Sequence, residues 1–231
     1  MLHSAATDRT PRLYVDSAET TAVSTLLRSG IAWGVTTNPT ILDRAQRRET
    51  EIPALYEQWV AEGAHEVFFQ TWGENRDDFV RHAHRMLQFG DRVVIKVPAT
   101  VEGFAAASTL VREGAPVLLT AVYTVGQALA AASVGARYIA PYLGRLRDAQ
   151  LPGDELIAHM QQVCEGSATD VLAASLRSAE DIVNLRLAGI RYFTAAPAVL
   201  DELVHHPITE SSAEQFEQAM TQVRSRRLTQ S

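Results

Sequence analysis

Lys96 is the residue of this chain with the clearest capacity for chemistry. Among the 21 basic residues of the 231-residue sequence, Lys96 is the one lysine and all the others are arginines. It lies in the run Val-Val-Ile-Lys-Val-Pro, residues 93–98, which carries no other charge. Burial disfavours an ammonium group and lowers its pKa, which leaves a neutral amine able to form a Schiff base with a carbonyl compound. A structural lysine paired with Asp16 or Glu102 is the alternative, but arginine, which cannot form a Schiff base, was available for that role.

Asp16 is the second candidate, because it follows the apolar residues Leu-Tyr-Val at positions 13–15. A carboxylate beside Lys96 could act as a general base. Aspartate is also favoured at helix N-caps, so capping the next helix is the alternative role.

Polar side chains recur where the other expected strands end. In α/β barrels the reactive groups lie at the carboxyl ends of the strands, so these positions are candidates for one site. Arg145 and Arg177 could bind phosphate, or could be two of the many surface arginines. Thr36 and Asn38 precede Pro39 and could instead form a plain turn. The full set is Asp16, Thr36, Thr37, Asn38, Gln70, Lys96, Thr120, Tyr123, Tyr142, Arg145, Ser175 and Arg177.

These residues need a scaffold, and the sequence alternates short apolar runs with longer amphipathic segments. The apolar runs predict strands buried on both faces at residues 13–16, 34–37, 66–71, 93–97, 117–121, 138–140, 171–174 and 192–195. Segments between them have apolar residues at helical spacing. Eight such units with no Pro/Gly-rich linker predict an α/β fold, a single (β/α)8 TIM barrel. An open doubly wound sheet would show the same alternation, but no Gly-x-Gly-x-x-Gly follows the first strand.

The two ends of the chain lie outside this pattern. Residues 1–12 are polar and predict a flexible N-terminal tail, which leaves residues 13–231 as one barrel domain. Phe216, Met220 and Val223 recur at helical spacing and predict an extra C-terminal helix at about residues 213–226. That helix could cap the barrel or pack on a neighbouring subunit.

Composition limits the partners and the location. The net charge of −6 and the pI of about 5.6 argue against binding to nucleic acid or to an anionic membrane. The one cysteine, Cys164, excludes an internal disulfide and fits a reducing cytosol. The seven histidines show no metal-ligand spacing, so we expect no metal and no cofactor. No run has the length of a membrane span or the form of a secretory signal, which favours a cytoplasmic protein.

Several motifs together resemble those of the short transaldolase and fructose-6-phosphate aldolase family. They are Leu-Tyr-Val-Asp-Ser-Ala at 13–18, Gly-Val-Thr-Thr-Asn-Pro at 34–39, Val-Ile-Lys-Val-Pro-Ala-Thr at 94–100, Thr-Ala-Val-Tyr at 120–123, Tyr-Ile-Ala-Pro-Tyr-Leu-Gly-Arg at 138–145 and Ala-Ser-Leu-Arg at 174–177. The match runs in order over about residues 13–216. The resemblance implies an eight-stranded α/β barrel with the Schiff-base lysine on its fourth strand, where Lys96 falls.

The resemblance also implies roles, substrates and assembly. Lys96 would attack the C2 carbonyl of a ketose, and Asp16 would relay protons to and from the sugar hydroxyls. The other implied roles are dihydroxyacetone binding by Asn38 and Thr36, and phosphate binding by Ser175, Arg177 and Arg145. The substrates would be sugar phosphates. Short members of the family tend to form rings and paired rings, with the C-terminal helix clasping a neighbour, so we expect a homo-oligomer.

Two positions bear on the branch of the family. Transaldolases typically have Glu where this chain has Gln70, and Phe where it has Tyr142. The pair found here resembles the aldolase branch, in which the tyrosine works with a water held by Gln70 and Thr120. The segments at 144–146 and 175–177 fit transaldolases as well. We therefore expect a class I aldolase that cleaves and forms the C3–C4 bond. A transaldolase that transfers the dihydroxyacetone unit is the alternative, and a phosphate-binding barrel without catalysis is an alternative of another class.

Overall fold

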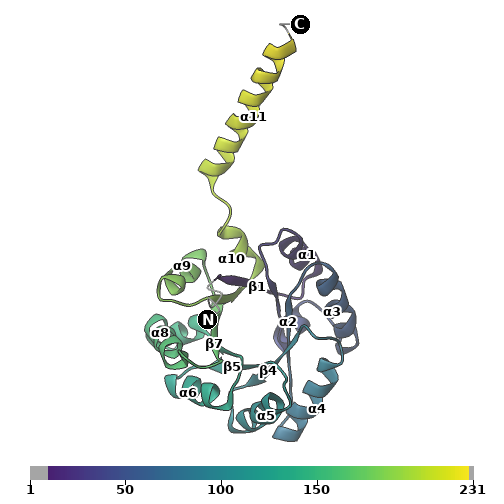
Figure 1. Cartoon of the computed structure of the whole chain (residues 1–231), viewed down its shortest axis with the longest axis vertical. Coiled ribbons are helices and arrows are strands. Elements are labelled where there is room, and N and C mark those ends of the chain that lie inside the picture. The colour runs from purple at the N-terminus through teal and green to yellow at the C-terminus, as the bar shows by residue number, and fades with distance from the viewer. Residues whose placement is uncertain (1–9, 229–231) are drawn as a thin grey trace, which may run out of the picture.

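Eight parallel strands close into a barrel, and their order around the ring is their order in the sequence. The computed structural model describes residues 10–228, with side chains over 10–225. β8 pairs with β1, with Phe193 beside Leu13, so the sheet has no open edge (Figure 1). This confirms the predicted (β/α)8 barrel and excludes the open sheet. The strands are β1 (Arg12–Asp16), β2 (Gly34–Thr36), β3 (Glu66–Gln70), β4 (Val93–Pro98), β5 (Val117–Val122), β6 (Tyr138–Pro141), β7 (Asp170–Leu176) and β8 (Tyr192–Ala195).

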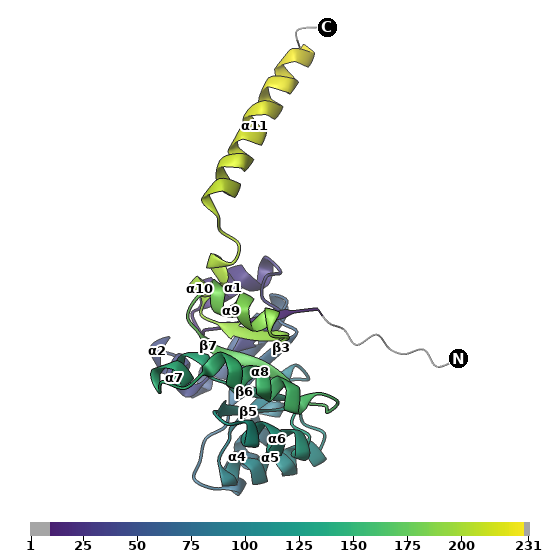
Figure 2. The same cartoon turned by 90° about the vertical axis from the view of Figure 1, so that its left-hand side faces the viewer.

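Most of the helices surround the barrel and bury apolar residues against the outside of the strands (Figure 1). The helices are α1 (Thr20–Arg28), α2 (Pro39–Arg44), the 3-10 turn η1 (Glu49–Glu51), α3 (Ile52–Ala61), α4 (Arg76–Leu87), α5 (Val101–Arg112), α6 (Val125–Val134), α7 (Leu143–Asp148), α8 (Gly153–Cys164), α9 (Ala179–Leu187), α10 (Pro197–Glu202) and α11 (Pro207–Leu228). The sequence pattern does not predict α2 or α7, which have six residues each. Figure 2 shows both at the end of the barrel away from the N-terminus.

The barrel interior is filled by layers of side chains from successive strands. Tyr14, Phe68, Val94 and Leu118 form part of the buried inner cluster. Side chains two positions apart on a strand face the same side. The next inward-facing positions toward the carboxyl ends are therefore Asp16, Gln70, Lys96 and Thr120, all polar. The apolar inner layer thus supports a polar layer above it.

A buried carboxylate occupies the inside of the barrel toward the amino ends of the strands. Glu66 accepts hydrogen bonds from the Tyr14 hydroxyl at 2.5 Å and from the Tyr138 hydroxyl at 3.2 Å. Arg137 forms an ion pair with it at 2.6 Å. These hydrogen bonds and the ion pair compensate the burial of the Glu66 charge. The side chains of this cluster fill the amino end of the barrel, so a ligand would bind at the carboxyl end.

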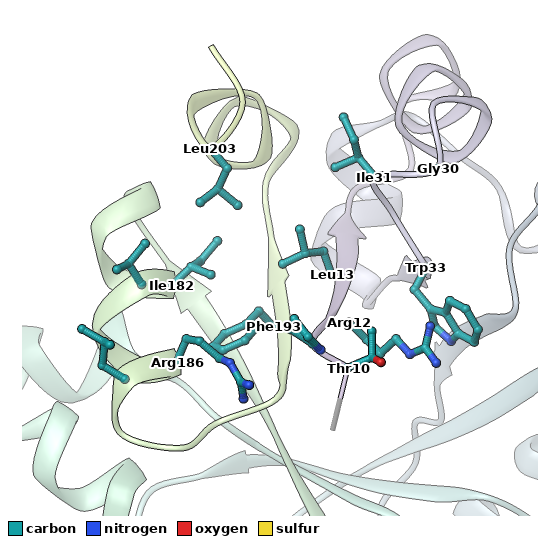
Figure 3. A pocket seen from close by; sticks show the side chains of 13 residues that line it. Thr10, Arg12, Leu13, Gly30, Ile31, Trp33, Ile182, Arg186, Phe193 and Leu203 are labelled. Carbon is teal, nitrogen blue, oxygen red and sulfur yellow. The ribbon is translucent and has the colours of Figure 1, made fainter. Parts of the chain in front are cut away.

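An apolar groove of about 470 Å³ lies on the outside of the barrel (Figure 3). Leu13, Ile31, Ile182 and Phe193 line it, and Leu203 closes one side. None of the residues predicted for the site lies in this groove.

The C-terminal helix α11 leaves the barrel and projects away from it (Figures 1 and 2). It begins at Pro207, six residues before the expected start at 213. The sequence pattern missed this first part because residues 207–212 contain one large apolar residue, Ile208, and so show no apolar periodicity. Ile208, Phe216, Met220 and Val223 are exposed on it. In the part of the chain that the structure describes, no helix has the length and apolar character needed to span a membrane. Residues 1–9 of the predicted N-terminal tail, 1–12, lie outside the described residues. Arg12, the last residue of that predicted tail, is the first residue of β1.

Candidate active site

A cavity of about 460 Å³ opens at the carboxyl ends of the strands. Of the ten residues to which the family resemblance gives a role, eight line it: Asp16, Thr36, Asn38, Gln70, Lys96, Tyr142, Arg145 and Ser175. They come from five strands, from the N-caps of α2 and α7, and from the first turn of α7. Thr120 and Arg177 are absent from the lining.

Lys96 is buried in this cavity, with 5% of its surface exposed. Its Nζ donates a hydrogen bond to the backbone carbonyl of Thr37 at 2.7 Å. Within the described side chains it forms no ion pair, and Glu102 instead accepts a hydrogen bond from the Arg76 backbone N–H. Burial lowers the pKa of Lys96, and the charge of Asp16 opposes that shift. The structure therefore gives no ion pair to the lysine, and its environment favours the neutral amine.

Asp16 accepts a hydrogen bond from the Thr36 hydroxyl at 2.6 Å. The Thr36 oxygen also lies 2.5 Å from the Thr194 hydroxyl. Since Thr36 uses its single proton on Asp16, Thr194 donates to Thr36. Burial raises the pKa of Asp16, while Lys96, Thr36 and Arg44 hold it down. Asp16 caps no helix, because the N-cap of α1 is Glu19.

Asn38 caps a helix where a plain turn was the alternative expectation, and it also lines the cavity. Its Oδ1 accepts a hydrogen bond from the Ile41 backbone N–H at 2.9 Å and so caps the N-terminus of α2. It also lines the cavity, where its side-chain NH2 remains a donor for a ligand hydroxyl.

Thr120 is absent from the cavity lining and forms a hydrogen bond with a residue that lines the cavity. Its Oγ1 is 2.7 Å from the hydroxyl of Tyr142. Burial raises the pKa of Tyr142, the Thr120 hydrogen bond opposes the shift, and the charge of Asp16 adds to it. Tyr142 is therefore a protonated donor at neutral pH.

Two strained residues lie at the site. Ala121 has φ of 58° and Ser175 has φ of 56°, and the strand register shifts at both places. Such left-handed conformations cost about 1–3 kcal/mol in residues other than glycine and cluster at functional sites. Neither bulge is predicted by the sequence pattern, because Ala121 and Ser175 are residue types that do not favour a left-handed conformation.

Gly144, in the first turn of α7, makes room for Ser175 and Arg177. A Cβ at this position would lie 2.8 Å from Ser175 Oγ and 2.7 Å from Arg177 Nε. The absence of a side chain therefore lets α7 approach the two residues.

The two predicted phosphate-binding arginines differ in their partners. Arg145 lines the cavity and has no hydrogen-bond or ion-pair partner among the described side chains. Arg177 forms a bidentate ion pair with Asp148, at 2.9 and 2.6 Å, outside the cavity lining. Both members of that pair are more than half exposed, with side-chain values of 57% and 52%.

Arg44 and Thr194 line the cavity and were not predicted. Arg44 ends α2, which is too short to show a helical pattern. Thr194 is the polar residue of β8, and its place near the end of an apolar strand is the signal that could have identified it. Within residues 10–228, no three His, Cys, Asp or Glu side chains converge as metal ligands would.

Comparisons with known proteins identify relatives of this chain. Residues 13–230 match the family described as Transaldolase/Fructose-6-phosphate aldolase. A probable transaldolase of Hyphomonas neptunium is 34% identical over 207 residues, which cover 89% of this chain and 94% of that protein. A probable transaldolase of Cereibacter sphaeroides is also 34% identical, over 208 residues, with the same coverage of 89% and 94%.

Among solved structures, the fold is similar to that of thiamine phosphate pyrophosphorylase from Pyrococcus furiosus. The TM-score is 0.60 at 17% sequence identity, with 83% of this chain and 89% of that chain covered. At this identity the likeness concerns the barrel fold alone.

Proposed function

Because the chain belongs to the transaldolase and fructose-6-phosphate aldolase family, we propose that it is a class I aldolase that acts on sugar phosphates through Lys96. The observation that carries the proposal is the environment of Lys96. A buried amine that forms no ion pair among the described side chains faces the cavity, and a carboxylate that can move protons, Asp16, lines the same cavity. A lysine that serves only structure would be expected to have an acidic partner.

The reaction begins with attack of the neutral Lys96 amine on the C2 carbonyl of a ketose phosphate. Loss of water from the carbinolamine leaves an iminium ion. Asp16 takes the proton of the C4 hydroxyl, the C3–C4 bond breaks, and its electron pair neutralises the iminium to give an enamine. The aldehyde phosphate leaves. Protonation of the enamine at C3 and hydrolysis of the resulting iminium release dihydroxyacetone and restore the amine.

The remaining site residues bind and orient the substrate in this proposal. Asn38 and Thr36 hold the hydroxyls of the dihydroxyacetone half. Ser175, Arg145 and Arg177 bind the phosphate of the aldehyde half. Arg177 must exchange Asp148 for the phosphate. The exchange is feasible because an exposed ion pair contributes only about 0–1 kcal/mol.

Tyr142 favours the aldolase over the transferase. An aldolase must protonate its enamine, whereas a transaldolase must keep it for a second aldehyde. A protonated Tyr142, hydrogen-bonded to Thr120 and facing the same cavity as Gln70, is suited to deliver that proton through a water. The second candidate function is transaldolase activity, which the names of the curated relatives favour.

One experiment tests the chemistry and a second tests the branch. Incubation with fructose 6-phosphate followed by borohydride should leave a reduced adduct on Lys96, found by peptide mass spectrometry. With one lysine in the chain, only the N-terminal amine could compete. Absence of the adduct would favour a phosphate-binding barrel without catalysis. Cleavage of fructose 6-phosphate without an acceptor aldehyde supports the aldolase, and activity seen only with erythrose 4-phosphate present supports the transaldolase.

We also infer a homo-oligomer and a cytoplasmic location. The exposed apolar residues of α11, a helix that projects from its own barrel, support packing against a second copy. The single cysteine, Cys164, which is buried, and the sugar phosphate substrates, which are intracellular metabolites, support the cytoplasm.

A further inference from the structure

Arg44 is a cation at the cavity that the proposed mechanism does not use. It is the last residue of α2, and it lines the same cavity as Lys96 and Arg145. α2 follows β2 and α7 follows β6, and these two strands lie opposite each other in the eight-stranded ring. Arg44 and Arg145 therefore approach the cavity from opposite sides of its mouth.

The arginines next to Arg44 in sequence have partners elsewhere. Arg47 donates hydrogen bonds to the Ala18 carbonyl and to the Thr20 hydroxyl. Arg48 forms an ion pair with Glu51 at 3.3 Å. Arg44, in contrast, has no hydrogen-bond or ion-pair partner among the described side chains, although it is a helix-terminal residue within reach of solvent.

The charges of the cavity lining favour an anionic ligand. Its cationic residues are Arg44, Lys96 and Arg145, and its one carboxylate is Asp16. Arg177 is neutralised by Asp148 outside the lining. The two guanidinium groups available to a ligand before any rearrangement are thus Arg44 and Arg145, and a guanidinium matches the oxygen geometry of a phosphate.

We propose that Arg44 binds the substrate phosphate from the side of the mouth opposite Arg145, and that it makes the enzyme select phosphorylated over non-phosphorylated substrates. This inference rests on the proposed function for its substrate. The competing role for Arg44 is electrostatic, because its charge also stabilises the Asp16 carboxylate. If Arg44 acted only by stabilising Asp16, its removal would lower the turnover of all substrates equally and would shift the pH profile of turnover.

The test compares Arg44→Gln, Arg44→Lys and the control Arg48→Gln. Arg48 lies on the same segment, has 82% of its side chain exposed and is absent from the cavity lining. Steady-state kinetics are measured for fructose 6-phosphate and for fructose. In Arg44→Gln we expect the ratio of the two kcat/KM values to fall about tenfold, through KM for the phosphorylated sugar, as loss of a charge-assisted hydrogen bond implies. Arg44→Lys should recover part of the ratio, and Arg48→Gln should keep it.

Binding of inorganic phosphate separates this inference from the proposed function. Phosphate should raise the melting temperature of the wild type and of Arg48→Gln, and it should do so less in Arg44→Gln. An unchanged substrate ratio and an unchanged phosphate response in Arg44→Gln would overturn the role of Arg44. Equal loss with both sugars and a shifted pH profile would overturn it in favour of the effect on Asp16. If the wild type gives no Lys96 adduct and no cleavage, the proposed function fails, while the phosphate response still decides the role of Arg44.

Discussion

A hydrogen bond of 2.7 Å joins the Thr120 hydroxyl to the hydroxyl of Tyr142, which lines the cavity. Thr120 comes directly before Ala121, whose left-handed conformation bends β5 at this point. Burial raises the pKa of Tyr142, so its proton stays in place at neutral pH. The arrangement fixes a neutral donor at the site, which is the property that distinguishes protonation of an enamine from its transfer.

Replacement Tyr142→Phe should therefore move the enzyme from cleavage toward transfer. We expect kcat for cleavage of fructose 6-phosphate without an acceptor to fall about 100-fold, which is within the usual range for loss of a general acid. The ratio of transfer to cleavage should rise, because an enamine that is not protonated persists until an aldehyde arrives. Both rates are measured by coupled assays, with and without erythrose 4-phosphate.

Tyr123→Phe is the matched control for this experiment, since its ring lies 6.0 Å from that of Tyr142 and its hydroxyl has no hydrogen-bond partner among the described residues. Gln70→Glu should change the ratio in the same direction as Tyr142→Phe. Equal losses of cleavage and transfer in Tyr142→Phe would contradict the assignment of Tyr142 as the proton donor.

The sequence predicted the barrel and most of the cavity for a definite physical reason. Strands buried on both faces read as apolar runs, and a polar residue that ends such a run, like Lys96 or Gln70, stands out. Arg44 could not be found this way, because one arginine among twenty on a short helix carries no periodic signal. The pairing of Arg177 with Asp148 joins residues 29 positions apart through side-chain geometry, which a linear pattern does not contain.

Asp16→Asn should shift the titration of Lys96 to lower pH. Burial lowers the pKa of Lys96, and the Asp16 carboxylate opposes this by stabilising the ammonium form. Without that charge the pKa falls further, so the neutral amine persists at more acidic pH. In a plot of borohydride-trapping rate against pH, the acid limb should then move to lower pH. Turnover should fall, because the general base is lost.

The control for this profile is Asp43→Asn, which removes an exposed carboxylate from α2 outside the cavity lining. Trapping by Asp43→Asn should follow the wild-type profile. A limb that moves to higher pH in Asp16→Asn would show that the carboxylate does not stabilise the ammonium form.

Asp148→Asn should strengthen binding of phosphorylated substrates. The Asp148 carboxylate holds Arg177 outside the cavity lining, and substrate phosphate must compete with it. Removal of the Asp148 carboxylate should lower KM for fructose 6-phosphate by up to about fivefold. This factor corresponds to about 1 kcal/mol, the upper end of the free energy that an exposed ion pair contributes. The comparison variant is Asp154→Asn, whose ion pair with Arg147 lies outside the lining. A higher KM in Asp148→Asn would mean that Asp148 orients Arg177 for binding.

Gly144→Ala should damage the phosphate end of the cavity. The added Cβ would lie 2.8 Å from Ser175 Oγ and 2.7 Å from Arg177 Nε, so the residues must move apart. We expect a loss of about 1–3 kcal/mol in the free energy of unfolding and a raised KM for phosphorylated substrates. Gly126→Ala on α6 is the control, because its Cβ would meet nothing closer than 3.9 Å. Urea denaturation should show Gly126→Ala at or above wild-type stability, and a stable Gly144→Ala would disprove the close approach.

The apolar stripe of α11 should hold copies of the chain together. Phe216 and Met220 are exposed, lie four residues apart and therefore share a face of the helix. A charge placed there would have to be buried in an interface, so Phe216→Asp and Met220→Asp should dissociate the assembly, which light scattering coupled to gel filtration would measure. Thr221→Asp adds the same charge at a neighbouring position off that stripe and should preserve the wild-type mass. Equal masses for all three variants would place the interface elsewhere, and a monomeric wild type would exclude it.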